Sequence, residues 1–203
     1  MSAKINNENI ALNEVHQINP DDIVSFGKLK KGLRTYMAIK GGFQTEKILN
    51  SRSFYKPITR MNRLKDNMEL DYIPCETYSP RIIQIKPDAF WSRNKIKVYP
   101  GPEYSLLDDK QLEALFANTF TIAKENNRLA YQLEEHLSPN DHTMLTSATL
   151  PGTVQLTPAG KLIILMMDGQ TTGGYPRILQ LSERSINLLA QKKYGDKIEF
   201  VLQ

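Results

Sequence analysis

Polar side chains and paired glycines crowd into one short stretch near the carboxyl end of the chain. Six apolar residues, 162–167, precede the stretch and predict a strand that is buried on both faces. Glycine lets another group approach backbone N–H donors, and glutamine and threonine supply donors and acceptors at short reach. The sequence therefore predicts a loop suited to a small polar ligand, built from Asp168, Gln170, Thr171, Thr172, Gly173, Gly174, Tyr175 and Arg177.

The charged and aromatic residues of this loop point to particular chemistry. Arg177 offers a planar guanidinium that can meet a carboxylate or phosphate through two hydrogen bonds. Tyr175 offers a stacking face or a hydroxyl, and Asp168 is suited to orienting Arg177 or a substrate N–H. The alternative is that residues 168–177 form only a tight turn between two strands.

Several runs of residues resemble one family. Gly152-Thr153-Val154-Gln155, followed by Asp168-x-Gln170-Thr171-Thr172-Gly173-Gly174-Tyr175-Pro176-Arg177, resembles the signature of the allophanate hydrolase subunit 2 family. That family includes the C subunit of 5-oxoprolinase and the carboxyltransferase part of urea carboxylase. The chain departs from it at Gly169, where the family often has arginine. Weaker matches are Tyr36 to Gly42, Asn50 to Ser53, Pro100 to Tyr104 and Asn127 to Leu133.

The resemblance implies an activity and a set of site residues. It implies the opening of 5-oxoproline to glutamate at the expense of ATP with Mg²⁺, in a complex with the A-like and B-like subunits of 5-oxoprolinase. Asp168 and Arg177 are the predicted catalytic residues. The predicted substrate- or nucleotide-binding residues are Arg128, Tyr131, Thr153, Gln155, Gln170, Thr171, Thr172, Gly173, Gly174 and Tyr175. For two of these a structural role is the alternative: Tyr131 as a core aromatic residue and Arg128 as a surface charge.

Two other functions fit the same resemblance. One is carboxyl transfer from carboxybiotin to urea or a related amide, whose edge Gln155, Gln170 and Thr172 are suited to recognise. The chain has no Met-Lys-Met-like attachment site, so we expect no covalent biotin. The other function is a non-catalytic regulator of a kinase inhibitor, in which the loop would bind a protein.

Composition excludes several classes of function. The 203 residues carry 26 basic and 22 acidic side chains, a net charge of +4 that is spread along the chain, and we expect no nucleic acid as partner. Cys75 is the single cysteine, and the three histidines have no spacing typical of a metal site. No membrane-spanning run or signal peptide is recognisable, which predicts a cytoplasmic protein.

The pattern of elements predicts a mainly β fold. We expect a partial amino-terminal β domain at 1–43, with a hairpin around 6–9 and a strand at 33–39, and a connecting segment at 44–78. Strands are expected at 82–85, 96–98, 120–122, 129–133, 153–156 and 198–202. The resemblance implies that 79–203 form a cyclophilin-like β-barrel. The family's amino-terminal Thr-Thr-Val-Gln-Asp-Leu-Gly-Arg-like motif has no counterpart here, so a truncated member is expected.

Two short helices are expected within the barrel domain. Asp108 is a candidate N-cap with Gln111 at the capping-box position, and Leu112, Leu115 and Phe116 form one apolar face. Ser182 is the candidate N-cap of the second helix, and Gly195 is its candidate C-cap.

Overall fold

The computed structural model describes residues 2–75, 92–142 and 144–203. The chain divides into two compact units, of which the first comprises Met1–Leu12, Ile18–Arg34 and Lys86–Gln203, and the second Asn13–Gln17 and Thr35–Ile85. This division places residues 35–43 with the segment predicted to be a connection. The predicted boundary between 78 and 79, and the predicted strand at 82–85, lie outside the described residues.

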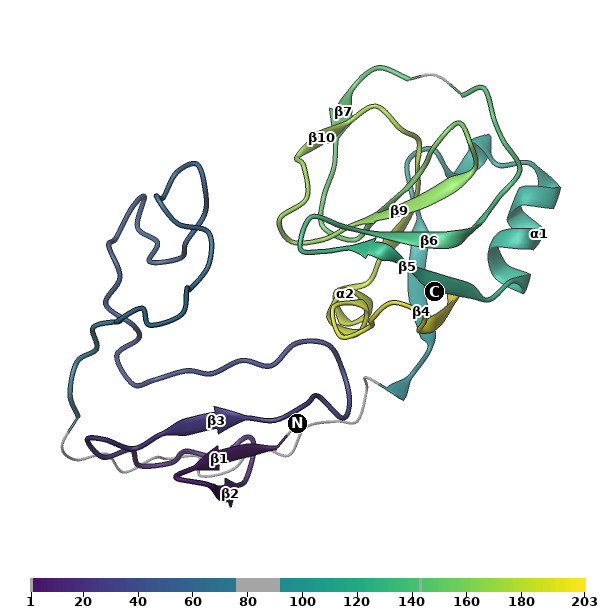
Figure 1. The fold of residues 1–203 in the computed structure, drawn as a ribbon. Helices are drawn as coiled ribbons and strands as arrows, with labels where there is room; N and C mark the ends of the chain where they lie inside the picture. The colour runs from purple at the N-terminus through teal and green to yellow at the C-terminus, as the bar shows by residue number, and fades with distance from the viewer. Residues whose placement is uncertain (1, 76–91, 143) are drawn as a thin grey trace. The chain divides into compact units, whose positions relative to one another are not determined.

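A closed seven-stranded barrel forms the core of the first unit (Figure 1). Its strands lie in the order β11 (Arg177–Leu181), β4 (Lys95–Pro100), β12 (Lys197–Leu202), β5 (Phe120–Asn126), β6 (Ala130–His136), β9 (Lys161–Leu165) and β8 (Thr153–Leu156). β8 pairs with β11 and closes the ring, and only the β12–β4 pair is parallel. Closure removes the exposed strand edges on which other chains could pair.

Alternation along the strands fills the barrel interior. Ile96 and Val98 of β4, and Ile198 and Phe200 of β12, are buried between exposed or half-buried neighbours, as the sequence predicts. Phe120 and Phe200 pack with their ring centroids 5.4 Å apart. The mainly β barrel with two short helices is therefore confirmed.

Both helices begin at the predicted N-caps. The Asp108 carboxylate accepts from the Gln111 N–H at 2.7 Å, and the Gln111 side chain accepts from the Asp108 N–H at 3.2 Å, which completes a capping box before α1 (Asp109–Ala117). Ser182 caps α2 (Glu183–Leu189) through the Ser185 N–H. α1 packs against β12 and α2 against β4, and a short 3₁₀ turn, η2 (Tyr104–Leu106), precedes α1.

A three-stranded sheet of β2 (Glu8–Ile10), β1 (Ala3–Ile5) and β3 (Val24–Phe26) completes the first unit. The predicted hairpin is confirmed, with Asn6 and Asn7 both at positive φ in its turn. Two remaining short strands, β7 (Ser147–Ala148) and β10 (Thr172–Gly173), pair with each other.

The second unit has little regular structure. Its described residues contain no strand or helix of their own, and the isolated bridges are Phe43 with Tyr72 and Ile48 with Ser51. The strand predicted at 33–39 is therefore wrong, because its apolar residues meet no neighbouring strand with which to form a ladder.

Two further predictions require correction. The apolar run 162–167 is not buried on both faces, because Ile163 is half-buried and Met167 is 72% exposed beyond the end of β9. Gly195 does not end α2, whose C-cap is Ala190; with φ at +82°, Gly195 instead lies in the turn before β12.

No helix in the described ranges has the length and apolar character needed to cross a membrane.

Candidate functional site

Two neighbouring strands and the loop after β9 gather most of the predicted site residues. Thr153 and Gln155 alternate along β8 with Val154 and Leu156, which belong to the barrel core, so the two polar side chains lie on the outer face of that strand. Gln155 is in register with Arg177 of β11 and with Ile163 of β9. The structure therefore brings these predicted segments together on the outside of the barrel wall.

The loop covers the outer face of β8. Gln170 donates from Nε2 to Gln155 Oε1 at 3.3 Å, and the hydroxyl of Thr149 donates to the backbone carbonyl of Gln170. β10 lies so close to Gln155 that a Cβ at Gly173 would stand 2.4 Å from Gln155 Nε2. Gly173 is needed here for close approach rather than for a positive φ. As a result Gln155 is only 1% exposed although it is polar.

Arg177 is held by a carboxylate that the sequence analysis missed. Its Nε donates to Glu103 Oε2 at 2.8 Å and its Nη2 to Glu103 Oε1 at 2.7 Å, in the bidentate arrangement. Nη1 donates to the carbonyl of Ala148 at 2.6 Å. Hydrogen bonding from Arg177 lowers the pKa of Glu103, and the same bonds raise the pKa of Arg177. The guanidinium thus joins the turn before η2 to β7 and β11.

Asp168 pairs with Arg128, not with Arg177. Asp168 Oδ2 lies 2.8 Å from Arg128 Nε, and Oδ1 accepts from Nη2 at 3.1 Å. The Asp168 N–H also donates to the Arg128 carbonyl, which ties the loop to the β5–β6 turn. The expectation that Asp168 orients Arg177 is therefore wrong, because each partners a residue from a different turn.

Tyr131 belongs to the barrel core. It is fully buried, and its hydroxyl donates to the Lys192 carbonyl at 3.1 Å and accepts from Arg34 Nη1 at 3.0 Å. Arg34 also lies over the ring, 5.8 Å from its centroid. The structural alternative for Tyr131 is supported, because neither ring face is open to a ligand.

The remaining predicted residues differ in exposure. Thr153 is buried, and its hydroxyl donates to Gln180 Oε1 at 3.0 Å. Thr171 uses its carbonyl to accept from the Thr149 N–H. Gln170, Thr171, Thr172, Gly174 and Tyr175 are exposed, Gly173 is half-buried, and a Cβ at Gly174 would meet nothing within 4 Å. The exposed part of the loop is therefore residues 170–175, of which 172–175 form the tip.

Sequence reasoning missed Glu103, Thr149 and Gln180. Glu103 did lie in the Pro100 to Tyr104 run that resembles the family, and that run was the available signal for it. Thr149 and Gln180 carried no signal, since isolated polar residues in β segments are common on solvent-facing strands.

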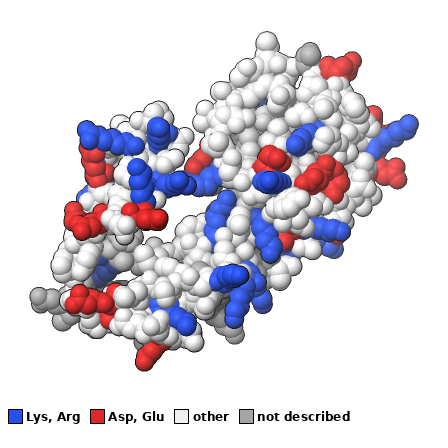
Figure 2. Space-filling model, viewed as in Figure 1, with Lys and Arg blue, Asp and Glu red and all other residues white. Residues whose placement is uncertain are grey.

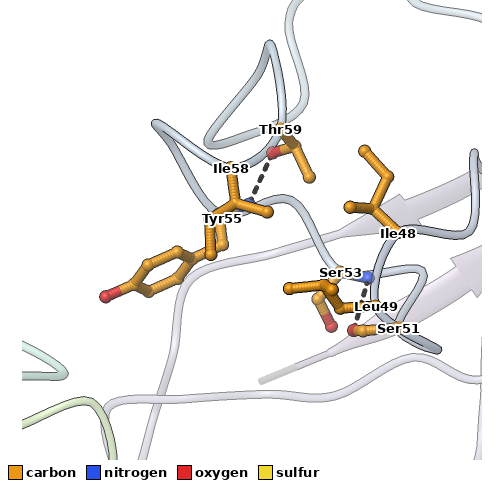
Figure 3. A pocket seen from close by; sticks show the side chains of 7 residues that line it. All are labelled: Ile48, Leu49, Ser51, Ser53, Tyr55, Ile58 and Thr59. Atoms are coloured by element: carbon orange, nitrogen blue, oxygen red, sulfur yellow. Dashed lines mark hydrogen bonds between the residues drawn. The ribbon is translucent and has the colours of Figure 1, made fainter.

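A separate cavity of about 240 Å³ lies in the second unit (Figure 3). Its polar groups are bonded within its own wall: the Ser53 N–H donates to Ser51 Oγ at 3.1 Å, and the Tyr55 N–H donates to Thr59 Oγ1 at 2.7 Å. It offers an apolar hollow rather than a catalytic arrangement, lined by Ile48, Leu49, Ser51, Ser53, Tyr55, Ile58 and Thr59.

The arginines near the loop bear on the predicted binding of ATP with Mg²⁺. Phosphate sites in proteins use cations or clusters of N–H donors, and the two arginines near the loop, Arg128 and Arg177, are each paired with a carboxylate. Within the described ranges no three His, Cys, Asp or Glu side chains gather to hold a metal ion. Basic and acidic side chains also occur side by side over the barrel in the view of Figure 2.

Comparison with known proteins places the chain in a family. Residues 1–202 match the family model described as carboxyltransferase domain, subdomain A and B. The chain is 32% identical to the C subunit of 5-oxoprolinase from Escherichia coli, in a match that covers 84% of this chain. It is 29% identical to the C subunit of 5-oxoprolinase from Haemophilus influenzae, in a match that covers 91% of this chain. It spans 56% and 61% of the length of these two relatives.

The fold comparison agrees. The urea amidolyase of Kluyveromyces lactis superposes with a TM-score of 0.79 at 24% identity, covering 99% of this chain and 14% of that one. This superposition agrees on the fold. The match of residues 1–202 to the family model confirms the family resemblance, and the chain belongs to the family of carboxyltransferase domains, subdomains A and B.

Proposed function

We propose that the chain is a subunit of an ATP-dependent 5-oxoprolinase, which hydrolyses 5-oxo-L-proline to L-glutamate together with A-like and B-like partner subunits. The observation that carries the proposal is the match to two bacterial proteins named as the C subunit of 5-oxoprolinase, which covers 84% and 91% of the chain. Both stretches are long enough to include the barrel and its signature loop.

The reaction defines what the loop must do. Water adds to the lactam carbonyl carbon, the carbon–nitrogen bond breaks, and the ring nitrogen takes a proton to become the amine of glutamate. Negative charge develops on the carbonyl oxygen, and preorganised N–H and O–H donors stabilise it. The exposed tip offers the hydroxyl of Thr172 and the backbone of Gly173 and Gly174 for this purpose.

The need for partners follows from what the loop lacks. Because the arginines Arg128 and Arg177 are both in ion pairs, we place the binding of ATP and Mg²⁺ on other parts of the complex. The chain would then contribute to recognition of the lactam and would be inactive alone. Asp168 and Arg177 stay predicted catalytic residues, with their carboxylate and guanidinium held in place by Arg128 and Glu103.

The test is reconstitution. The chain is mixed with the A-like and B-like subunits from the same organism, and 5-oxoproline-dependent release of ADP and glutamate is measured. We expect equal amounts of both products, and a loss of at least tenfold in Thr172→Ala, since one transition-state donor is typically worth more than that. Thr119→Ala, an exposed threonine next to α1, is the matched control. No product with any partner combination would refute the proposal.

A second function is favoured by a specific finding. The family model describes a carboxyltransferase domain, and a urea amidolyase of Lachancea kluyveri is 26% identical over 98% of this chain, which covers 12% of that protein. Carboxyl transfer from carboxybiotin to urea or a related amide is therefore the alternative. Formation of the carboxylated amide from supplied carboxybiotin, without ATP turnover on 5-oxoproline, would select it. Partner binding without either reaction would select the regulator of a kinase inhibitor.

A further inference from the structure

The positive charge of the chain is concentrated in one segment of the second unit. Residues 47–65 carry six basic side chains and no acidic one, whereas the whole chain carries 26 basic and 22 acidic side chains. The net charge of +4 is therefore not spread evenly, and the rest of the chain has a small acidic excess. All six basic residues are exposed: Lys47, Arg52, Lys56, Arg60, Arg63 and Lys65.

No carboxylate neutralises these six side chains within the described part of the chain. The ion pairs between described residues join Arg128 to Asp168 and Arg177 to Glu103, and both lie in the first unit. Arg52 donates from Nη1 to the Thr45 carbonyl, which is a neutral group. The segment therefore presents a positive surface that attracts an anionic partner.

The same segment surrounds the apolar hollow of the second unit (Figure 3). Leu49 and Ile58, which line it, are 82% and 52% exposed. The hollow measures about 240 Å³. Sites for drug-sized ligands and cofactors usually measure roughly 300–1,000 Å³. The hollow is therefore better suited to a single large side chain than to a cofactor.

We propose that residues 47–65 form a docking surface for an acidic segment of a partner protein, which places one large apolar side chain in the hollow and its carboxylates beside the basic side chains. The inference concerns the second unit and does not rest on the proposed function. Protein interfaces commonly combine an apolar anchor in a pocket with a polar rim. Opposite charges on the two surfaces speed the encounter and select the partner.

A protein segment fits this surface better than a nucleic acid or a membrane does. The N–H groups of Ser53 and Tyr55 are bonded within the wall of the hollow, so they are not available to the polar edge of a base. Apolar side chains that protrude enter a membrane, whereas a hollow receives a side chain from the partner. An acidic peptide supplies both the negative charge and the side chain.

The first experiment measures the binding of two labelled peptides to the full chain by fluorescence anisotropy. Both peptides have blocked ends and a run of glutamates on each side of a central residue, which is leucine in one and alanine in the other. We expect the leucine peptide to bind about tenfold more tightly, since its side chain removes more apolar surface from water. Salt raised from about 0.05 M to about 0.5 M should weaken both complexes. Equal affinities, or no binding by either peptide, would overturn the inference.

Two other anionic probes test the alternative occupants in the same assay. One is a single-stranded thymidine oligonucleotide with the same charge as the leucine peptide, and the other is a vesicle of phosphatidylcholine and phosphatidylserine. We expect both to compete with the leucine peptide only weakly, because neither places a side chain in the hollow. Tighter binding by the oligonucleotide or the vesicle than by the leucine peptide would replace the protein partner with that class of ligand.

The second experiment assigns peptide binding to this segment. Arg60→Glu combined with Arg63→Glu should lower the affinity for the leucine peptide about tenfold or more, because each change turns an attraction into a repulsion. Lys110→Glu, at an exposed position of α1, is the matched control and should keep the affinity. An equal effect of the control would mean that only the overall charge matters, and the docking surface would be refuted.

The hollow has a test of its own. Ile58→Ser should abolish the preference for the leucine peptide over the alanine peptide while the salt dependence stays, because it changes the lining and leaves the six charges in place. A ¹H–¹⁵N NMR spectrum that is unchanged outside the segment checks the fold of each variant. An unaltered preference in a folded Ile58→Ser would refute the role of the hollow. All these measurements use the chain alone, so their outcome is independent of whether the complex hydrolyses 5-oxoproline.

Discussion

The two register partners at the candidate site, Arg177 on β11 and Gln155 on β8, differ in how their polar groups are satisfied. Arg177, at the β11 end, places its three guanidinium nitrogens on Glu103 and on the Ala148 carbonyl. Gln155, its register partner on β8, is left with one amide nitrogen unbonded. Arg177 was predicted to be catalytic and Gln155 to bind a ligand, and Arg177 is already bonded to the protein.

The difference teaches where ligand recognition can reside. A guanidinium that a bidentate carboxylate neutralises holds the loop in shape, and displacing that carboxylate for a substrate would cost much of what the pair contributes. An oriented neutral amide without a partner gains a hydrogen bond when an acceptor arrives. Of the two residues, Arg177 is therefore held by the protein, and Gln155 keeps an amide donor that the protein does not use.

Removing the Glu103 carboxylate is the most direct test of the anchoring of Arg177, and it has the largest expected effect. Glu103→Ala leaves the Arg177 charge without its partner, and we expect a loss of about 2–3 kcal/mol in the free energy of unfolding. The two side chains are 18% and 19% exposed, which places the effect below that of a fully buried pair. Urea unfolding of the chain measures it.

Glu103→Gln is the control for this prediction. It keeps an acceptor for one Arg177 N–H and should recover about half of the loss. If Glu103→Ala lowered the free energy of unfolding by less than about 0.5 kcal/mol, Arg177 would be available to a ligand after all. The contrast between Arg177 and Gln155 would then disappear.

Lowering the pH should weaken the ion pair between Arg177 and Glu103. The pKa of Glu103 lies below its ordinary value of 4.5 in the folded chain, because Arg177 donates hydrogen bonds to it. The pair therefore stabilises the fold fully above about pH 4.5 and loses that contribution as the pH falls through the lower folded-state pKa.

The measurement compares the chain with Glu103→Gln, since hydrogen bonding also lowers the pKa of Asp22 and Glu135 elsewhere. The stability difference between the two proteins should be constant from pH 7 to about pH 5 and should shrink below about pH 4.5. A difference that grows toward acid would contradict the assigned direction of the shift.

Sequence patterns predicted local elements better than they predicted which elements pair with each other in the fold. The capping box of Asp108 and Gln111 was recognisable because its two hydrogen bonds depend on residues three apart. The strand at 33–39 failed because an apolar alternation becomes a strand only when a neighbour supplies the ladder, and no local pattern reveals that neighbour.

The site shows the same limit. The loop was found because its residues are contiguous, but the pairing of Arg177 with Glu103 joins residues 74 positions apart. Likewise, nothing in the sequence of β8 indicated that β10 would cover its polar face, and Thr153 and Gln155, which were predicted to bind a ligand, are buried. Which polar groups remain unsatisfied is a tertiary property.

Breaking the ion pair of Asp168 with Arg128 should have the smallest effect on the free energy of unfolding. Arg128 has a side chain that is 70% exposed, so its bidentate contact with Asp168 competes with water. We expect Asp168→Asn to change the free energy of unfolding by about 0–0.5 kcal/mol, measured as for Glu103→Ala. Since that change leaves the fold intact, Asp168→Asn can test the predicted catalytic role cleanly. If 5-oxoproline turnover by the complex falls while stability holds, the carboxylate acts on the substrate; if both hold, Asp168 only ties the loop to the β5–β6 turn.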